Sequence, residues 1–235
     1  MNSSARSKQF HLPIARYGWR ELLACGVVLA AVAVVLMLWG RWAYATIPIA
    51  LLAFTVSFFR DPERAVPAEP GVLVAPADGR IVEISHVNES QFIGGPALRI
   101  GIFLSVFDVH VNRAPCDGVV KTLSYRKGRF RNALVPASSE ENESNSIGIE
   151  TAESSGKRVV VRQIAGAVAR RIVCDCREGQ SVQRGQRIGM IKFGSRTELY
   201  VPADAPFVPV VDVGQRVKGG STILGRFECA GEDEA

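Results

Sequence analysis

The sequence predicts a mainly β domain of the α+β class, preceded by an N-terminal hydrophobic helical hairpin. Residues 22–59 contain a single charge, Arg41, whereas the chain from Asp61 onward alternates short β-branched runs with Gly, Pro and Asp. Apolar residues make up 47% of the 235 residues and charged residues 22%, which excludes a disordered chain. The 22 Gly and 12 Pro indicate many turns and argue against a long helical bundle.

The net charge and the cysteines exclude further classes of protein and of binding site. Lys and Arg number 28 against 23 Asp and Glu, for a net charge of +5. This mild excess suits an anionic surface or substrate, and it falls short of the dense basic patch of a nucleic-acid-binding protein. The cysteine count is odd and no pair has the C-x-x-C spacing, so we expect free thiols in a reducing compartment, with neither a disulfide framework nor a metal site. The cysteines are Cys25, Cys116, Cys174, Cys176 and Cys229.

Two uncharged runs, Leu22–Gly40 and Trp42–Phe59, form the predicted hairpin. The 19 residues of the first run would span about 28 Å as a helix, roughly the hydrocarbon thickness of a bilayer. Lys and Arg flank the pair on both sides, so we expect both ends to be cytoplasmic. Pro48 interrupts the second run, which leaves a re-entrant hairpin as an alternative, and a buried helical pair in a soluble core is another. The flanking cations are Arg6, Lys8, Arg16, Arg20, Arg60 and Arg64.

These boundaries predict a basic N-terminal segment at 1–21, a membrane-associated hairpin at 22–60 and a β-rich domain at 61–235. Within the last, Gly166–Cys174 favours a short helix. Strands are predicted at Val72–Val74, Arg80–Ser85, Leu98–Leu104, Val119–Tyr125, Ser146–Thr151 and Arg158–Ile164.

Two internal repeats occur in the β-rich domain. Val74–Ile84 and Arg113–Leu123 share A-P-x-D-G followed by an alternating strand, and Gly179–Phe193 and Gly214–Phe227 share G-Q-x-V-x-x-G followed by an apolar strand. This pattern resembles the biotinyl/lipoyl or barrel-sandwich type of small β-structure. A carrier function would need an exposed Lys at a hairpin tip, and Lys192 fits that poorly. We therefore interpret the repeats as scaffold.

Several motifs, taken in order, resemble phosphatidylserine decarboxylase proenzymes of the short bacterial type. One motif alone, such as K-F-G-S-R, is weak, but the ordered set extends from Phe58 to about Gly225. The matching stretches are Phe58–Arg64, Ala75–Ile81, Ile102–Gly118, Tyr125–Phe130, Ser139–Glu143, Val161–Val173 and Lys192–Arg196.

The resemblance implies a cofactor made from the chain itself, at the cleavage site Gly194–Ser195. The Ser195 hydroxyl attacks the Gly194 carbonyl, and the resulting ester is eliminated to leave a pyruvoyl group, which forms a Schiff base with the substrate. The products would be a β chain, 1–194, and an α chain, 195–235, joined as a heterodimer. We expect the second G-Q repeat, in the α chain, to pair with the first.

The resemblance also assigns His110 and Asp78 to catalysis. A neutral imidazole can take the Ser195 proton or serve as general acid and base in decarboxylation. A carboxylate at Asp78 would orient that ring, although Asp117 stands in the sister repeat and makes a turn role a serious alternative. Arg113 stands where longer members carry a second His, so the base for self-cleavage stays open: His110, another base, or strain at Gly194.

Three cations are candidates for contact with the lipid: Arg196, Arg126 and Lys127. The resemblance places Arg196 beside the reacting group, where it could bear on an anionic part of the lipid head. The acidic segment Ser138–Ser146 follows the basic stretch that contains the other two. It is equally well interpreted as a solvated loop or as a mobile segment at the membrane or substrate entrance.

The function implied is pyruvoyl-dependent decarboxylation of phosphatidylserine to phosphatidylethanolamine and CO₂, at the cytoplasmic face of the cell's inner membrane. The implied partners are phosphatidylserine and an anionic membrane, with no metal and no nucleic acid, and with any higher oligomer left open. One alternative is a pyruvoyl decarboxylase for a soluble amino acid, which would need no anchor. Another is a membrane-anchored lipoyl-like adaptor without catalysis, which would have no need for Gly194–Ser195.

Overall fold

The computed structural model describes residues 13–131, 134, 138–152, 157–167, 171–192 and 195–228. The chain forms two compact units, Met1–Glu63 and Arg64–Ala235, and each is described by itself. Gly194 and Cys229 lie outside the described residues. The described cysteines are all free thiols: Cys25, Cys116, Cys174 and Cys176.

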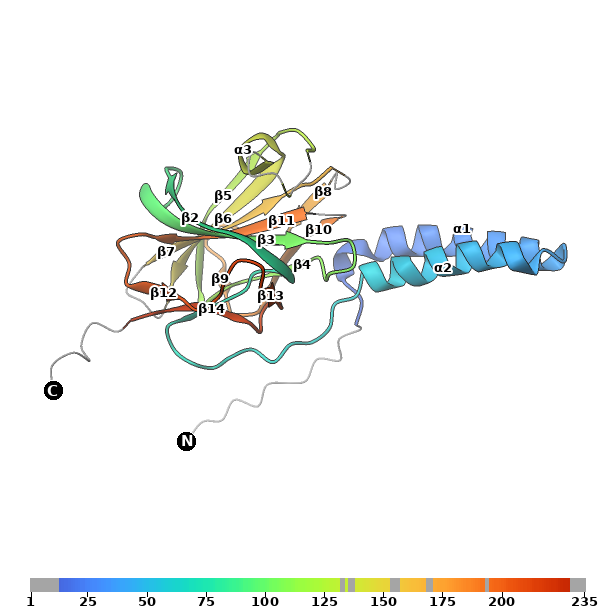
Figure 1. The fold of residues 1–235 in the computed structure, drawn as a ribbon, viewed down its shortest axis with the longest axis horizontal. Coiled ribbons are helices and arrows are strands. Elements are labelled where there is room, and N and C mark those ends of the chain that lie inside the picture. Colours follow the sequence, from blue (N-terminus) through green and yellow to red (C-terminus); the bar gives the residue numbers. More distant parts are fainter. Residues whose placement is uncertain are drawn as a thin grey trace. The chain divides into compact units, whose positions relative to one another are not determined.

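The first unit is the helical hairpin. A short 3₁₀ turn, Arg16–Gly18, leads into α1, Trp19–Leu38, and α2 follows at Trp42–Phe58. Figure 1 shows the two helices side by side, and the turn between them uses Gly40, whose φ of 70° is strained for other residues. The hairpin predicted from the uncharged runs is therefore confirmed as two helices.

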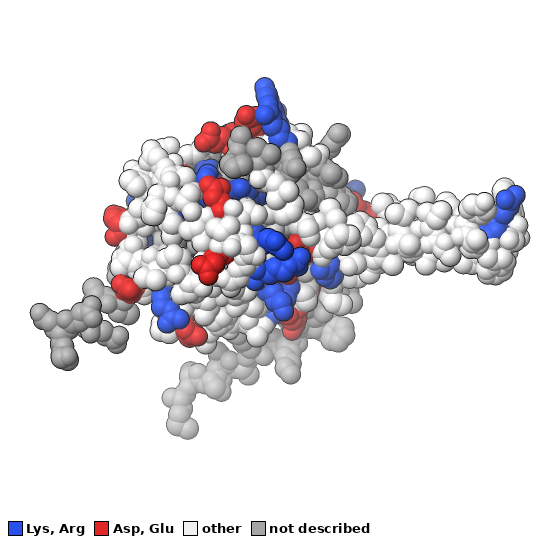
Figure 2. All heavy atoms as spheres, viewed as in Figure 1, with Lys and Arg blue, Asp and Glu red and all other residues white. Residues whose placement is uncertain are grey.

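The surface of the hairpin is apolar. Val27 and Val28 are 62% and 61% exposed, and Figure 2 shows an uncharged flank with a basic group at the tip. Arg16–Leu38 is the one described helical stretch that is both long and apolar enough to cross a membrane, and only 6% of its most apolar window is buried. A helix that leaves its apolar side chains uncovered suits a lipid environment better than a soluble core. The N-terminal helix therefore has the character of a membrane anchor.

The second unit is mainly β, as predicted. Eight strands form one curled sheet, in the order β13-β2-β3-β11-β7-β6-β5-β9 (Figure 1). Two further sheets have three strands each, β1-β14-β12 and β4-β10-β8. The elements are β1 Val72–Val74, β2 Gly79–Glu89, β3 Gly95–Leu104, β4 Val111–Arg113, β5 Gly118–Arg126, α3 Ser138–Glu141, β6 Ser144–Thr151, β7 Arg158–Ile164, β8 Arg171–Cys174, β9 Ser181–Val182, β10 Arg187–Lys192, β11 Ser195–Pro202, β12 Phe207–Pro209, β13 Arg216–Val217 and β14 Ile223–Phe227.

All six predicted strands are present, each within a few residues of its expected ends. The predicted helix over Gly166–Cys174 is wrong, because its second half is strand β8. Ile172 pairs with Ile191 of β10 in an antiparallel ladder. The β-branched pair Ile172-Val173 favours this ladder, and the ladder outweighs the helical preference of the preceding alanines.

The hydrophobic core draws residues from all three sheets. In β3 the core face carries Ile100, Ile102 and Leu104, and in β11 it carries Leu199 and Val201. Side chains alternate along a strand, so the odd-numbered residues of β11 point into this core and the even-numbered ones point to the other face of the sheet. This alternation decides the surroundings of each site residue in β11.

The large sheet has an internal twofold arrangement. Its strand order reads the same from both ends once β13 is matched with β9, β2 with β5, β3 with β6, and β11 with β7. The two small sheets match in the same way, β1-β14-β12 with β4-β10-β8. One half is the continuous stretch from β4 to β10, and the other is made of β1–β3 and β11–β14. The second half is therefore interrupted by the first.

The sequence repeats supply equivalent strand pairs in the two halves of this arrangement. Strand β2, after A-P-A-D-G, pairs with β13 of one G-Q repeat, and β5, after A-P-C-D-G, pairs with β9 of the other. The Ile81 N–H donates to the Gln215 carbonyl at 2.9 Å, and the Val120 N–H donates to the Gln180 carbonyl at the same distance. The expectation that the two G-Q repeats pair with each other is wrong, because each pairs with an A-P-x-D-G strand instead.

Candidate active site

Ser195 is the first residue of β11, at the centre of the large sheet. Its backbone pairs with Leu104 of β3, and its side chain points to the core side of the sheet. Ser195 is fully buried, and its Oγ has no hydrogen-bond partner. Buried hydroxyls are normally hydrogen-bonded, since leaving one unpaired costs about 1–3 kcal/mol. The buried Thr151 hydroxyl is a second exception of this kind, and the position of Ser195 directly after Gly194 is what makes its hydroxyl the candidate functional group.

His110 ends the loop between β3 and β4. The carboxylate of Asp108 braces this loop by accepting hydrogen bonds from the backbone N–H of Ser105 at 2.8 Å and its hydroxyl at 2.7 Å. The imidazole Nδ1 of His110 lies 2.9 Å from the Asp108 carbonyl oxygen. A carbonyl only accepts hydrogen bonds, so this contact places the proton on Nδ1 and makes Nε2 the basic nitrogen of the neutral ring.

The sheet register brings His110 and Ser195 to the same end of the β3–β11 pair. Leu104, opposite Ser195, is the last residue of β3, and the braced loop starts directly after it. At the other end of the loop, the Ile191 N–H donates to the His110 carbonyl at 3.2 Å. Ile191 lies in β10, whose chain continues to Ser195. His110 and Ser195 are far apart in the sequence. The β3–β11 ladder and the contact between β10 and His110 place them at the same end of the sheet.

A chain of buried amides ties β4 to β11. The Asn145 amide donates to the Gln163 carbonyl oxygen at 3.0 Å, Gln163 donates to Asn112 at 2.9 Å, and Asn112 donates to the Thr197 hydroxyl at 3.0 Å. All four side chains are buried. Asn112 follows His110 closely and Thr197 follows Ser195, so the chain fixes the two candidate catalytic segments against each other. These amides were not among the site residues predicted from the sequence, although a polar amide within a predicted buried strand is a usable signal.

Asp78 and Asp117 occupy equivalent places in the two halves. The Asp78 carboxylate accepts a hydrogen bond from the Gly219 N–H at 2.8 Å, and the Asp117 carboxylate accepts one from the Arg184 N–H at 2.9 Å. Asp78 adds an ion pair with Arg64 at 2.6 Å. Burial raises the pKa of the Asp78 carboxyl above its usual value, and Arg64 opposes this shift. The contacts support the turn role for both residues, and the orienting role of Asp78 stays a prediction.

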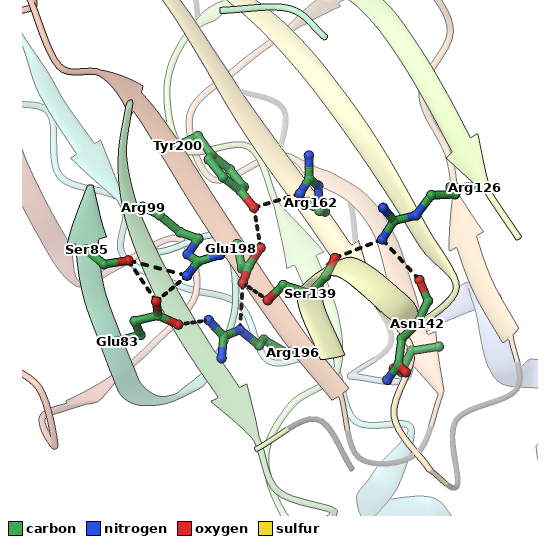
Figure 3. A network of polar contacts seen from close by, with 11 residues as sticks. Glu83, Ser85, Arg99, Arg126, Ser139, Asn142, Arg162, Arg196, Glu198 and Tyr200 are labelled. Carbon is green, nitrogen blue, oxygen red and sulfur yellow. Dashed lines mark hydrogen bonds and ion pairs between the residues drawn. The ribbon is translucent and has the colours of Figure 1, made fainter. Parts of the chain in front are cut away.

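Arg196 points away from Ser195, to the polar face of the sheet. Its guanidinium is 1% exposed, donating from Nε to Glu198 at 2.7 Å and from Nη2 to Glu83 at 2.5 Å (Figure 3). Glu83 also accepts from Arg99 and Ser85. The predicted contact between Arg196 and a lipid head group stays a prediction.

Arg126 joins the same network from the edge of the sheet. Its Nη2 donates to the Ser139 carbonyl at 2.8 Å, and the Ser139 hydroxyl donates to Glu198 at 2.5 Å (Figure 3). Lys127, next along the chain, is exposed. The acidic segment that contains Ser139 is thus docked onto β11 through Glu198, which excludes a purely solvated loop for its described part.

The described residues contain no group of three or more His, Cys, Asp or Glu side chains that could hold a metal ion.

Glu83 gives the network a pH dependence. Burial alone would raise the pKa of its carboxyl, but hydrogen bonds from Arg196, Ser85 and Arg99 outweigh burial and lower the pKa from 4.5 to about 2. A lowered pKa means that the folded state holds the ionised form more tightly than the unfolded state does. The stabilisation is therefore complete above the unfolded pKa and is lost as the pH falls towards 2.

We predict that Glu83→Gln lowers the urea midpoint of the full chain at neutral pH and that this difference from wild type shrinks between about pH 5 and about pH 2. Urea titrations followed by circular dichroism at several pH values measure it. A difference that is independent of pH would contradict the assignment. Glu69→Gln is the matched control, because Glu69 is exposed and its contact with Arg226 is long, at 3.9 Å.

Comparison with known proteins supports a single family. The family profile described as phosphatidylserine decarboxylase matches residues 51–225. A phosphatidylserine decarboxylase proenzyme of Rhodopirellula baltica is 46% identical over 218 residues, covering 92% of this chain and 89% of its own. Proenzymes of the same name from Carboxydothermus hydrogenoformans and Symbiobacterium thermophilum are 43% and 45% identical, and they cover 92% and 91% of this chain and 98% and 95% of their own.

Proposed function

Because the chain belongs to the phosphatidylserine decarboxylase family, we propose that it cleaves itself before Ser195 and decarboxylates phosphatidylserine to phosphatidylethanolamine and CO₂. The observation that carries this proposal is the buried Ser195 Oγ, which has no hydrogen-bond partner at the head of the central strand. A hydroxyl used for nucleophilic attack must be able to leave its resting contacts, and this one has none to break. The proenzyme thus gives two chains that stay together.

The cleavage chemistry requires one nucleophile and one leaving group. The Ser195 Oγ forms an ester with the Gly194 carbonyl carbon as the Gly194–Ser195 amide bond breaks. The amine that is released takes up the proton that the hydroxyl loses. Loss of a proton from the Ser195 Cα then expels the Gly194 carboxylate, and water replaces the nitrogen, which leaves as ammonia. The C-terminal chain therefore begins with a pyruvoyl group at position 195. When formed, this group supplies the electron sink for the electrons released with CO₂.

The surroundings of Ser195 fit such a group. The side chain lies on the apolar core side of β11, between Leu104 and the buried Thr197. In the pyruvoyl group a ketone oxygen would stand in place of the Ser195 nitrogen, and the side chain would be a methyl group, so its formation would remove a buried hydroxyl that has no hydrogen-bond partner.

His110 is the proposed proton carrier. The bond from Nδ1 to the Asp108 carbonyl fixes the tautomer, so Nε2 can accept the Ser195 proton during cleavage. In the mature enzyme the same nitrogen can return a proton to the substrate carbon that has lost CO₂. The braced loop holds the ring in one orientation for both tasks.

The cations and the N-terminal helix bear on the lipid contacts and the cellular location of the protein. The exposed Lys127 and the neighbouring Arg126 are proposed to contact the lipid head group or anionic membrane. The N-terminal anchor is proposed to hold the catalytic domain at the cytoplasmic face of the inner membrane, with basic residues flanking the hairpin on that side. The duplicated β-structure supports a lipoyl-like relationship for the scaffold, which stays a proposal.

We predict that Ser195→Ala leaves the chain as one 235-residue species with a free N-terminus and no decarboxylase activity. Alanine keeps the Cβ and fills nearly the same buried space, so the fold should be retained. Intact mass and carbonyl trapping with hydroxylamine measure the outcome. Ser195→Cys should mature slowly or in part, because a thiol can make the acyl shift but the elimination is less efficient. Splitting at this bond in Ser195→Ala, or continued CO₂ release, would contradict the pyruvoyl mechanism.

We predict that His110→Ala lowers decarboxylation by about 10²- to 10⁴-fold, the usual contribution of a general acid and base, and slows cleavage as well. A gel time course for cleavage and CO₂ release from phosphatidylserine vesicles measure both. His86→Ala is the control, since His86 is exposed near the end of β2. Full maturation and normal turnover in His110→Ala would make His110 a structural residue.

The equivalent positions of Asp78 and Asp117 allow a matched test of the cleavage assignment. Both Asp→Asn variants keep an oxygen that can accept the partner backbone N–H. We predict that Asp78→Asn slows cleavage by about tenfold or more, because the orienting carboxylate of the proposed base is lost, while Asp117→Asn cleaves normally. Arg64→Gln shows how much of the effect comes from the ion pair alone. Equal cleavage rates in the two Asn variants would leave Asp78 with only its turn role.

A further inference from the structure

We infer that Arg196 is a positioning residue, whose side chain fixes the start of β11 once the bond before Ser195 is broken. This inference rests on the proposed function, because only cleavage turns residue 195 into a chain end. The reacting group then has to be held by the residues on its C-terminal side. Arg196 is the first of these, and its side chain lies on the opposite face of the sheet from the reaction.

Backbone pairing at this end of β11 is one-sided. Ser195 pairs with Leu104 of β3, whereas pairing with β7 starts at Arg196, opposite Ile164. Strand ends fray when their last residue lacks partners on one side. An intact chain restrains Ser195 through Gly194, and cleavage removes that restraint. The next fixed point along the strand is Arg196.

The Arg196 guanidinium is fixed from two sides. It lies above Gly101 and reaches across β3, with Nη2 on Glu83 of β2 at 2.5 Å and Nε on Glu198 of its own strand at 2.7 Å. A Cβ on Gly101 would lie 2.6 Å from Nη2, so the glycine leaves the space that the guanidinium occupies. A planar donor group held by two carboxylates has little freedom to rotate.

The two carboxylates are themselves held. Ser139 donates to Glu198 at 2.5 Å, and Tyr200 donates to the other oxygen of the same carboxylate at 2.5 Å (Figure 3). Burial and the charge of Glu198 raise the pKa of the Tyr200 hydroxyl, which keeps it protonated as a donor. Glu83 is held by Arg99 and Ser85. The anchor of Arg196 is therefore a rigid frame and not a flexible surface pair.

Cleavage divides this frame between two chains. Glu198 and Tyr200 remain in the fragment that begins at residue 195, whereas Glu83 and Ser139 belong to the other fragment. The Arg196–Glu83 pair consequently becomes the first side-chain contact along β11 that joins the new chain end to the neighbouring chain, ahead of the contacts of Thr197 and Glu198. The pair has little effect on position 195 in the uncleaved chain and a large effect after cleavage.

The test uses Glu83→Gln in the full-length, self-cleaved protein in detergent micelles. We expect amide hydrogen exchange at residues 196–198 to rise by about tenfold or more, because the strand end opens more often. We expect kcat on phosphatidylserine to fall while KM stays within about twofold, because the substrate's own contacts are intact. In the uncleaved Ser195→Ala background, the same substitution should raise exchange at residues 196–198 no more than in the middle of β11, because only the overall stability is lowered there.

Gly101→Ala is the second variant, because it displaces the guanidinium without removing a charge and should reproduce the same changes. It replaces Glu83→Gln if that variant does not fold. Arg158→Lys is the matched control. It changes an exposed arginine on the same sheet face, which donates to the Phe92 carbonyl at 3.2 Å and lies at the opposite end of β7 from Ile164, the partner of Arg196. It should leave exchange at residues 196–198 unchanged.

Two results would overturn the inference alone: unaltered exchange in the cleaved variants, or a raised KM with unchanged kcat, which would instead indicate contact between Arg196 and the lipid head group. A wild-type chain that stays whole overturns the proposed function and this inference together. Cleavage is read from the gel before exchange is measured, so the two failures are distinguishable.

Discussion

The hydrogen-bonded placement of β11 between β3 and β7 is the constraint on which the rest of the site depends. Ser195 stands at the first position of this strand, so the ladder with β3 fixes where the proposed nucleophile lies. The same ladder sets which side chains point into the core and which point to the polar face. His110 reaches the site because β3 ends opposite Ser195 and because β4 pairs with β10, the strand before β11.

Polar groups within the β domain are arranged so that few are left unpaired. The amide chain from Asn145 to Thr197 satisfies groups on the core side, and the frame around Arg196 and Glu198 satisfies charges on the other side. Burying such groups is costly unless each finds a partner, so networks of this kind specify one register for the strands. The Ser195 hydroxyl is an exception to this pairing within the described chain. An unpaired hydroxyl at the head of the central strand is a stronger functional sign than the Gly-Ser pair in the sequence.

Local patterns in the sequence were sufficient for the six predicted strands and for the helical hairpin, but they predicted a helix where β8 lies. Alternation and β-branched residues placed the strands, and the uncharged runs placed both helices. Pairing between distant segments was not readable in the same way. The two G-Q repeats resemble each other because they occupy equivalent places, and equivalence in a twofold arrangement does not mean contact. For Asp78 the equivalence was informative, since its likeness to Asp117 predicted a turn role that the structure supports. The place of Arg196 depends on Glu83, which the sequence separates from it by more than a hundred residues.

Because one half of the twofold arrangement is interrupted by the other, unfolding of the mature protein is coupled to dissociation of its two chains. Among strands β11 to β14, only β12 and β14 pair with each other. The other partners lie in the preceding part of the chain: β11 pairs with β3 and β7, β13 pairs with β2, and β14 pairs with β1. A chain that begins at residue 195 therefore has no core of its own. Once cleaved, the enzyme cannot release this fragment without losing its fold, so dissociation and denaturation become one equilibrium. Its thermal stability then depends on protein concentration, whereas that of the precursor does not.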